Sequence, residues 1–419
     1  MTRAHIGVAW TVVLLGACAS PSATDSNSTG SDESTDSTGA SDTTIVASTT
    51  STEPSSTSSA DTTSTADTTT GDPATGCPGT TLLPNPTDFS ARGPWPVGVR
   101  TTTIDDLTVE VWYPAVPGSD DGVDPAIYDI RLAIPESERE KISDADNPWQ
   151  PCECRRDLPI DDGHGPYPVI VFVHGTASFR TQSLPQMVHW ASRGFVVIAA
   201  DHPGLWLADL LGGFCGEPMV MQDLGGDVDA MLAAVRGDAP GLEDFATVID
   251  ATRIGMSGHS AGGGAVSGFG GDAQVIVPLA SGGVDAGDAL QSVLVMGGTD
   301  DSIVDYGQQQ AGYADAPSPK RLVGVAAGGH LSFSEICSLT NDAGDNLLEI
   351  ANAAGVCGAQ FAGFLFQCSD TLIPDPDAWA IVDFATAAAF EEVLQCAEIG
   401  DAFDVLRERE GVQEVLETR

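Results

Sequence analysis

The chain has 419 residues, and its 60 acidic side chains against 17 Lys and Arg residues give a formal net charge of −43. A polypeptide this negative is not expected to bind nucleic acid or to dock electrostatically on anionic lipid, because both surfaces carry the same sign of charge. The length allows one large domain or two average ones.

The first 18 residues predict a lipoprotein signal peptide. A basic start, MTRAH, precedes the apolar run IGVAWTVVLL, which is too short to cross a bilayer comfortably. Residues 15–18, LGAC, resemble a bacterial lipobox, which implies that Cys18 is diacylated and anchors the protein to a membrane. The alternative is an ordinary cleaved signal peptide with a chance cysteine. Because no aspartate follows Cys18, the resemblance favours an exported outer-membrane lipoprotein, periplasmic or at the cell surface.

Residues 19–76 consist almost entirely of Ser, Thr, Asp, Ala and Gly, without Lys, Arg or aromatic residues. Such a segment cannot bury enough apolar area to offset its ordering entropy, so we expect a disordered tether. As a flexible coil it has an r.m.s. span of roughly 40 Å. Residues 77–419 then form one large domain.

The predicted domain holds an even number of cysteines, which in an exported chain predicts disulfides. They are Cys77, Cys152, Cys154, Cys215, Cys337, Cys357, Cys368 and Cys396. Eight cysteines allow 105 pairings, so the connectivity stays open. No second Cys/His pair at zinc-like spacing accompanies Cys152 and Cys154, and we expect no metal site.

From residue 108 onward, strand patterns alternate with helical ones. Apolar runs typical of strands cover residues 108–115, 167–175, 194–204, 252–257, 273–281, 292–298 and 321–329. Helical spacing covers residues 180–193 and 225–238, and a last helix is expected at 387–398. This alternation predicts an α/β fold with a mostly parallel sheet and helices on both faces. In such sheets, chemistry gathers beyond the carboxyl ends of the strands.

Ser260 follows one of these strands in the sequence GHSAG. A nucleophile on a sharp strand-to-helix turn needs small residues two positions before and after it, here Gly258 and Gly262. The five-residue motif alone would occur by chance roughly 0.4 times in this chain, so its context decides. A buried strand precedes Ser260 and a helix start follows, which favours a nucleophile over a simple glycine-rich bend.

A serine nucleophile requires a base and a carboxylate. His330 ends a strand pattern downstream of Ser260 and is the best base, whereas His259 is expected to point elsewhere by strand alternation. Asp300 and Asp301 both follow the strand pattern at 292–298, and the residues alone leave the choice between them open. The chain order serine, acid, histidine is that of α/β-hydrolases.

An oxyanion hole needs two backbone N–H groups. One is expected from Ala261, directly after the nucleophile, and the other from Thr176, in the loop after the strand at 167–175. The alternative for that loop is a plain strand-ending turn.

Several motifs together resemble a known superfamily. They are GPWPVGVRTTTI, VEVWYPA, GPYPVIVFVHG, WASRGFVVIAADHPG, GHSAGGG, GGTDDSIV and GGHLSF. Their order resembles that of bacterial α/β-hydrolases of the dienelactone hydrolase-like and platelet-activating-factor acetylhydrolase-like types, and the resemblance covers about residues 94–330. Cutinase-like polyesterases are close relatives.

The resemblance implies roles for five residues. Ser260 is the nucleophile, His330 the base and Asp301 the preferred acid, with Thr176 and Ala261 as the oxyanion donors. Dienelactone hydrolases proper use a cysteine nucleophile, so the serine favours ordinary ester cleavage.

The expected protein is therefore an exported, lipid-anchored serine esterase that needs no metal or organic cofactor. Its substrate is a small-molecule or lipid-like ester. The alternatives are a polyester hydrolase, or a surface binding domain with a vestigial triad. The apolar segment 205–226 is expected to be a lid or acyl-binding wall, or else a helix packed in the core.

Overall fold

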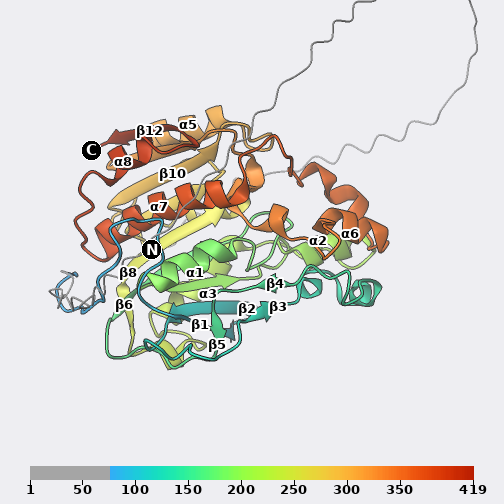
Figure 1. Ribbon diagram of the computed structural model, residues 1–419, viewed down its shortest axis with the longest axis horizontal. Coiled ribbons are helices and arrows are strands. Elements are labelled where there is room, and N and C mark those ends of the chain that lie inside the picture. Colours follow the sequence, from blue (N-terminus) through green and yellow to red (C-terminus); the bar gives the residue numbers. More distant parts are fainter. Residues whose placement is uncertain (1–75) are drawn as a thin grey trace, which may run out of the picture. The chain divides into compact units, whose positions relative to one another are not determined.

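The computed structural model describes residues 76–419, so the predicted signal peptide, the anchor at Cys18 and nearly all of the tether lie outside the described residues. A ten-stranded sheet dominates this part of the chain, in the order β12-β11-β10-β9-β8-β6-β7-β2-β1-β5 (Figure 1). The strands are β1 (Val97–Ile104), β2 (Leu107–Pro114), β5 (Arg155–Arg156), β6 (Tyr167–Val173), β7 (Val196–Ala200), β8 (Ile249–His259), β9 (Val275–Leu279), β10 (Ser292–Gly298), β11 (Lys320–Val325) and β12 (Val412–Thr418). A small second sheet pairs β3 (Ile127–Tyr128) with β4 (Gln150–Pro151).

The six central strands, from β11 to β7, run parallel, and antiparallel β12 and β2 flank them. The mixed α/β class with a large, mostly parallel sheet is confirmed, and each of the seven strand patterns overlaps an observed strand. This arrangement is compatible with an α/β-hydrolase fold. The strand order reverses at β6, since β7 lies on one side of β6 and β8 on the other. Sheets of this type bind ligands at such a reversal, beyond the carboxyl ends of the strands.

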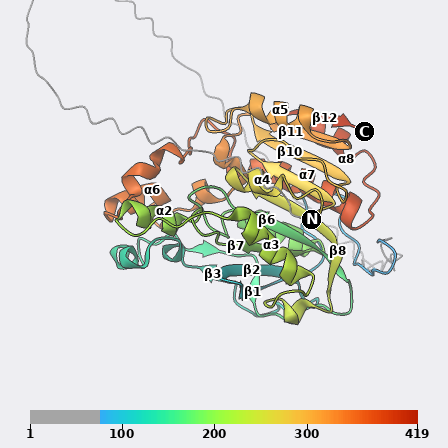
Figure 2. The same ribbon diagram turned by 180° about the vertical axis from the view of Figure 1, so that it is seen from behind.

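Helices cover both faces of the sheet. They are α1 (Leu184–Ser192), α2 (Leu207–Phe214), α3 (Leu224–Val235), α4 (Ala261–Val266), α5 (Tyr306–Asp315), α6 (Leu347–Ala353), α7 (Asp375–Leu394) and α8 (Ala402–Arg407). Short 3₁₀ turns are η1 (Ile130–Ala133), η2 (Glu136–Lys141), η3 (Glu243–Phe245), η4 (His330–Phe333), η5 (Ile336–Ser338) and η6 (Ala359–Phe364). Helices α1 and α7 lie over one face of the sheet (Figure 1). Helices α3 and α4 lie over the other face, which Figure 2 shows.

Two hydrophobic clusters fill the space between the helices and the sheet. On β6, Ile170 and Phe172 belong to the cluster beneath α1 and α7, whereas Val169 and Val171 belong to the cluster beneath α3. Successive side chains of a strand point to opposite faces, so a continuous run of β-branched residues supplies both clusters at once. This explains why all seven residues of β6 are buried.

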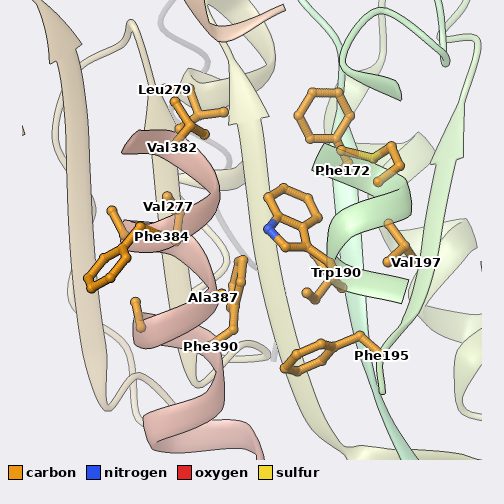
Figure 3. Close-up of a cluster of buried hydrophobic side chains, with 14 of the residues drawn as sticks. Phe172, Trp190, Phe195, Val197, Val277, Leu279, Val382, Phe384, Ala387 and Phe390 are labelled. Carbon is orange, nitrogen blue, oxygen red and sulfur yellow. The ribbon is translucent and has the colours of Figure 1, made fainter. Parts of the chain in front are cut away.

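Aromatic side chains join α1 to α7 over the sheet (Figure 3). The rings of Trp190 and Phe390 meet edge to face with centroids 5.4 Å apart, and the indole N–H donates to Thr386 Oγ1 at 2.8 Å. The helix expected at residues 387–398 is longer and differently placed, because α7 begins at Asp375 and ends at Leu394. The helix as a whole lacks a strong amphipathic pattern, because most of its residues from Ile381 to Leu394 are buried.

All eight cysteines of the described residues form disulfides. The pairs are Cys77–Cys396, Cys152–Cys154, Cys215–Cys357 and Cys337–Cys368. Four disulfides indicate an oxidising, extracellular environment. Within residues 76–419, no group of three or more His, Cys, Asp or Glu residues could hold a metal ion. No helix of the same region is long and apolar enough to span a membrane.

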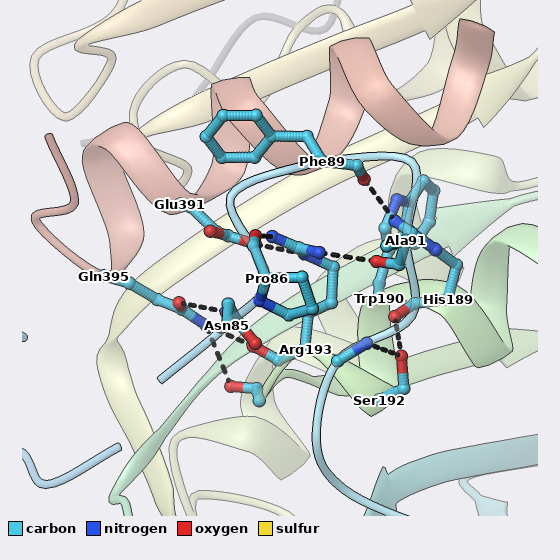
Figure 4. Close-up of polar contacts among 12 residues, drawn as sticks. Asn85, Pro86, Phe89, Ala91, His189, Trp190, Ser192, Arg193, Glu391 and Gln395 are labelled. Atoms are coloured by element: carbon cyan, nitrogen blue, oxygen red, sulfur yellow. Dashed lines mark hydrogen bonds and ion pairs between the residues drawn. The ribbon is translucent and has the colours of Figure 1, made fainter. Parts of the chain in front are cut away.

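A fully buried arginine ties the start of the domain to α7 (Figure 4). Arg193 forms an ion pair with Glu391 and donates hydrogen bonds to the backbone carbonyls of Pro86 and Ala91. The pKa of Glu391 is raised because burial disfavours its charged form, and the charge of Arg193 opposes this effect. The buried charges of Arg193 and Glu391 therefore stabilise each other in the core.

We predict that Arg193→Met lowers the free energy of unfolding by about 3–5 kcal/mol, because it leaves Glu391 buried without its counter-charge. Urea denaturation of the full chain measures the change. The control is Arg407→Ala, which removes a largely exposed ion pair with Asp404 and should cost less than about 1 kcal/mol. Equal losses for the two variants would contradict the role given to Arg193.

Candidate active site

Three side chains that are far apart in the sequence meet at the carboxyl edge of the sheet. The hydroxyl of Ser260 donates to His330 Nε2 at 3.0 Å, and His330 Nδ1–H donates to Asp301 Oδ2 at 2.9 Å. Ser260 directly follows β8, Asp301 follows β10, and His330 follows β11. Because these parallel strands end at the same edge of the sheet, the fold brings the three residues into one hydrogen-bonded line.

Ser260 occupies a tight turn between β8 and α4. Its backbone has φ 54° and ψ −118°, a conformation that residues with a side chain rarely adopt. The turn is closely packed: a Cβ added to Gly262 would lie 2.1 Å from the carbonyl oxygen of Val173, and one added to Gly258 would lie 2.4 Å from that of Gly262. Only glycine fits at both positions, as the GHSAG pattern indicates.

His330 is held through its backbone as well as its ring. Its N–H donates to Gln367 Oε1 at 2.8 Å, and its C=O accepts a hydrogen bond from His259 Nε2 at 2.8 Å. Sequence reasoning assigned His259 no part in the site, yet its ring centroid lies 4.8 Å from that of His330. Burial, and then the nearby His330, lower the pKa of His259 to about 3. His259 therefore stays neutral, and its single ring proton is on Nε2, which donates to the carbonyl of His330.

The carboxylate of Asp301 is fully buried and surrounded by donors. Oδ1 accepts from the N–H groups of Ile303 and Val304, at 2.8 and 2.9 Å. Oδ2 accepts from Gln309 Nε2 at 3.0 Å and from His330. These contacts fix the orientation of the carboxylate toward the imidazole.

Asp300, which the residues alone left as an alternative, is exposed, and its carboxylate lies 3.5 Å from the hydroxyl of Thr299. The geometry thus selects Asp301 as the neighbour of His330. Gln309, on α5, was missed by sequence reasoning because no motif marks it. Only its place on a helix that follows the aspartate could have suggested a contact.

Among the backbone N–H groups near Ser260, those of Thr176 and Ala261 have no hydrogen-bond acceptor within residues 76–419. In the turn after β6, Gly175 N–H donates to Gln182 Oε1 and Ala177 N–H donates to the carbonyl of Leu205, whereas Thr176 N–H has no acceptor within this part of the chain. The N–H of Ala261 is likewise unused there, since it begins α4.

Both N–H groups belong to residues close to Ser260 in the structure. A Cβ added to Gly175 would lie 3.4 Å from Ser260 Cβ, so the turn after β6 passes directly beside Ser260. Both residues predicted as oxyanion donors, Thr176 and Ala261, therefore flank Ser260. The arrangement could hold a negative charge that develops on an oxygen bound to Ser260.

The apolar segment expected at residues 205–226 forms α2, the loop after it and the first residues of α3. Leu211 packs with Ile350 and Val356 in a small cluster separate from the two main ones, so this helix is not part of the main core. Met219 and Met221 in the loop are strongly exposed, at 68% and 84%. A lid or acyl-binding role for the segment stays a prediction.

One family model, described as platelet-activating factor acetylhydrolase, isoform II, matches residues 149–204. The matched part contains β6, α1 and β7 together with Thr176, and it ends before Ser260. No curated protein matches the chain. The partial match supports a hydrolase family of the platelet-activating-factor acetylhydrolase type, and it suggests an enzyme that acts on esters.

We predict opposite effects for two neighbouring glycine substitutions in the turn. Gly262→Ala should lower the free energy of unfolding by about 1–3 kcal/mol, because its Cβ would overlap the backbone of β6. Gly264→Ala should be neutral or stabilising by up to about 1 kcal/mol, because the nearest atom to its Cβ would be 4.0 Å away and alanine favours the helix. Chemical denaturation measures both, and a harmless Gly262→Ala would show that the turn is not tightly packed.

Proposed function

We propose that the protein is a serine hydrolase that cleaves carboxylic esters, with Ser260 as nucleophile, His330 as general base and Asp301 as the orienting acid. The observation that carries the proposal is the continuous line from Ser260 Oγ through the imidazole to Asp301, starting at a serine with a strained backbone. The family match, which suggests an ester hydrolase, supports the reaction class.

The geometry supports a two-step acyl transfer. As Ser260 Oγ attacks the ester carbonyl, His330 Nε2 takes its proton, and the N–H groups of Thr176 and Ala261 stabilise the oxyanion. The imidazolium gives this proton to the alcohol oxygen, the C–O bond breaks and an acyl-enzyme remains. Water then attacks the acyl group with His330 as base, and the acid leaves with Ser260 restored. Asp301 stabilises the imidazolium in both steps.

The surroundings of the turn after β6 favour a lipid-like ester as substrate. Gln222 Nε2 donates to the carbonyl of Gly204, which places the loop with Met219 and Met221 close to Leu205. The carbonyl of Leu205 in turn accepts from Ala177, beside the proposed oxyanion donor. Exposed methionines at this edge offer an apolar surface to an acyl chain. A cutinase-like polyester substrate uses the same chemistry and is distinguished by product release from a polyester film.

We also propose that the enzyme acts outside the cytoplasm, anchored through acylated Cys18. The disulfides support export, because they form in oxidising compartments. The complete set of catalytic groups supports an active enzyme rather than a binding domain with a vestigial triad.

We predict that Ser260→Ala lowers kcat/KM for short p-nitrophenyl esters at least about 10⁴-fold, because the covalent step is lost. A fluorophosphonate should label Ser260 in the wild-type chain and leave the variant unlabelled, as peptide mass spectrometry would show. Ester turnover that survives the substitution would refute the proposal.

The two neighbouring aspartates provide a matched pair. Asp301→Asn should lower kcat by about 10³–10⁴-fold, because an amide can no longer stabilise the imidazolium or fix its tautomer. Asp300→Asn should change kcat less than about threefold, since its carboxylate is exposed and lies beside the hydroxyl of Thr299. A larger loss for Asp300→Asn would reverse the assignment.

A further inference from the structure

One glutamine outside the proposed catalytic groups bridges two of the loops that carry them. Gln367 Oε1 accepts from His330 N–H at 2.8 Å and from Ser302 N–H at 3.3 Å, and Gln367 Nε2 donates to the carbonyl of Asp300 at 2.7 Å. Asp300 and Ser302 are the two neighbours of Asp301 in the chain. A single carboxamide therefore holds the backbone on both sides of the acid and the backbone of the base.

Other backbone contacts between these loops stop short of the histidine. The N–H of Asp300 donates to the carbonyl of Gly328 at 2.9 Å, and Ala327 N–H donates to Thr299 Oγ1 at 2.9 Å. These bonds extend the pairing of β10 with β11 only to residue 328. At His330 itself, the N–H donates to Gln367 Oε1, and the C=O accepts from Nε2 of His259, the residue before Ser260.

The glutamine is itself held by a disulfide. Cys368 directly follows Gln367 and is bonded to Cys337, in the 3₁₀ turn η5 that closely follows His330. Further along the same segment, Ile373 N–H donates to the carbonyl of Ala327 at 2.9 Å. The segment is thus fixed at two points after Gln367, covalently at Cys368 and by a backbone hydrogen bond at Ile373.

We propose that Gln367 is a positioning residue that sets the distance between His330 and Asp301, and that the Cys337–Cys368 disulfide keeps it in place. This inference rests on the proposed function. The role needs a carboxamide, because one atom must accept two hydrogen bonds while the other donates one. Glutamate would keep the acceptor and lose the donor to Asp300, whereas alanine would lose all three bonds.

The test uses the full chain with Gln367→Ala, Gln367→Glu and, as the control, Gln308→Ala, which changes an exposed glutamine of α5. For Gln367→Ala we expect kcat on a soluble p-nitrophenyl ester to fall about 10–100-fold with KM unchanged, because small misplacements of catalytic groups have effects of this size. The rate of fluorophosphonate labelling at Ser260 should fall in parallel. Gln367→Glu should be intermediate, and the control should match the wild type.

Two results separate this inference from the proposed function. If Ser260→Ala abolishes turnover while Gln367→Ala keeps the wild-type kcat, the proposed function stands and the positioning role is wrong. A rise in KM without a fall in kcat would also overturn it, since that would indicate a contact with substrate. If Gln367→Ala fails to fold, Gln367→Glu decides, because it preserves size and two of the three bonds.

The part played by the disulfide is tested by a double-mutant cycle. Replacing Cys337 and Cys368 by Ser should lower kcat, and adding Gln367→Ala should cause little further loss, because both changes remove the same constraint. The control pair, Cys152→Ser with Cys154→Ser, should leave kcat unchanged. If the loss in kcat of the combined variant equals the product of the two separate losses, the disulfide and the glutamine act separately. That result would overturn this part of the proposal.

Discussion

The site depends on one strained backbone conformation, that of Ser260. A residue with a side chain in this region of φ and ψ costs about 1–3 kcal/mol and persists only where its surroundings leave no alternative. Here β8 is paired on both sides, with β6 and with β9. The N–H of Ser260 donates to the carbonyl of Leu279, and its C=O accepts from Gly264 N–H. Both peptide groups of the turn are therefore fixed, and the hydroxyl stands beyond the edge of the sheet.

The same strand edge assembles the partners of this serine. The reversal of strand order at β6 sets the turn that carries Thr176 beside the end of β8, while β10 and β11 carry the acid and the base. Hydrogen bonds between these loops then fix their relative positions. His259 binds the C=O of His330 and Gln367 binds its N–H, so the imidazole is placed by its main chain as well as by Asp301.

Much of this arrangement could be predicted from the sequence, because local patterns determine it. Buried strands appear as runs of β-branched residues, and the crowded turn at Ser260 requires glycines at fixed spacing. The edge strand β12 was not predicted, because its polar, mostly exposed residues show no apolar run. Gln309 and Gln367 were missed for a different reason: their partners lie on other loops, and one polar side chain carries no signal of a long-range contact. Disulfide pairing depends on the fold in the same way.

The central claim is that the ring of His330 joins Ser260 to Asp301, and the protonation of its two nitrogens tests this claim directly. Nitrogen NMR of the ¹⁵N-histidine-labelled chain, at a pH where the ring is neutral, distinguishes the two tautomers. We predict a proton on Nδ1, facing the carboxylate, and an unprotonated Nε2 that accepts from Ser260. A neutral ring that carries its proton on Nε2 would contradict it.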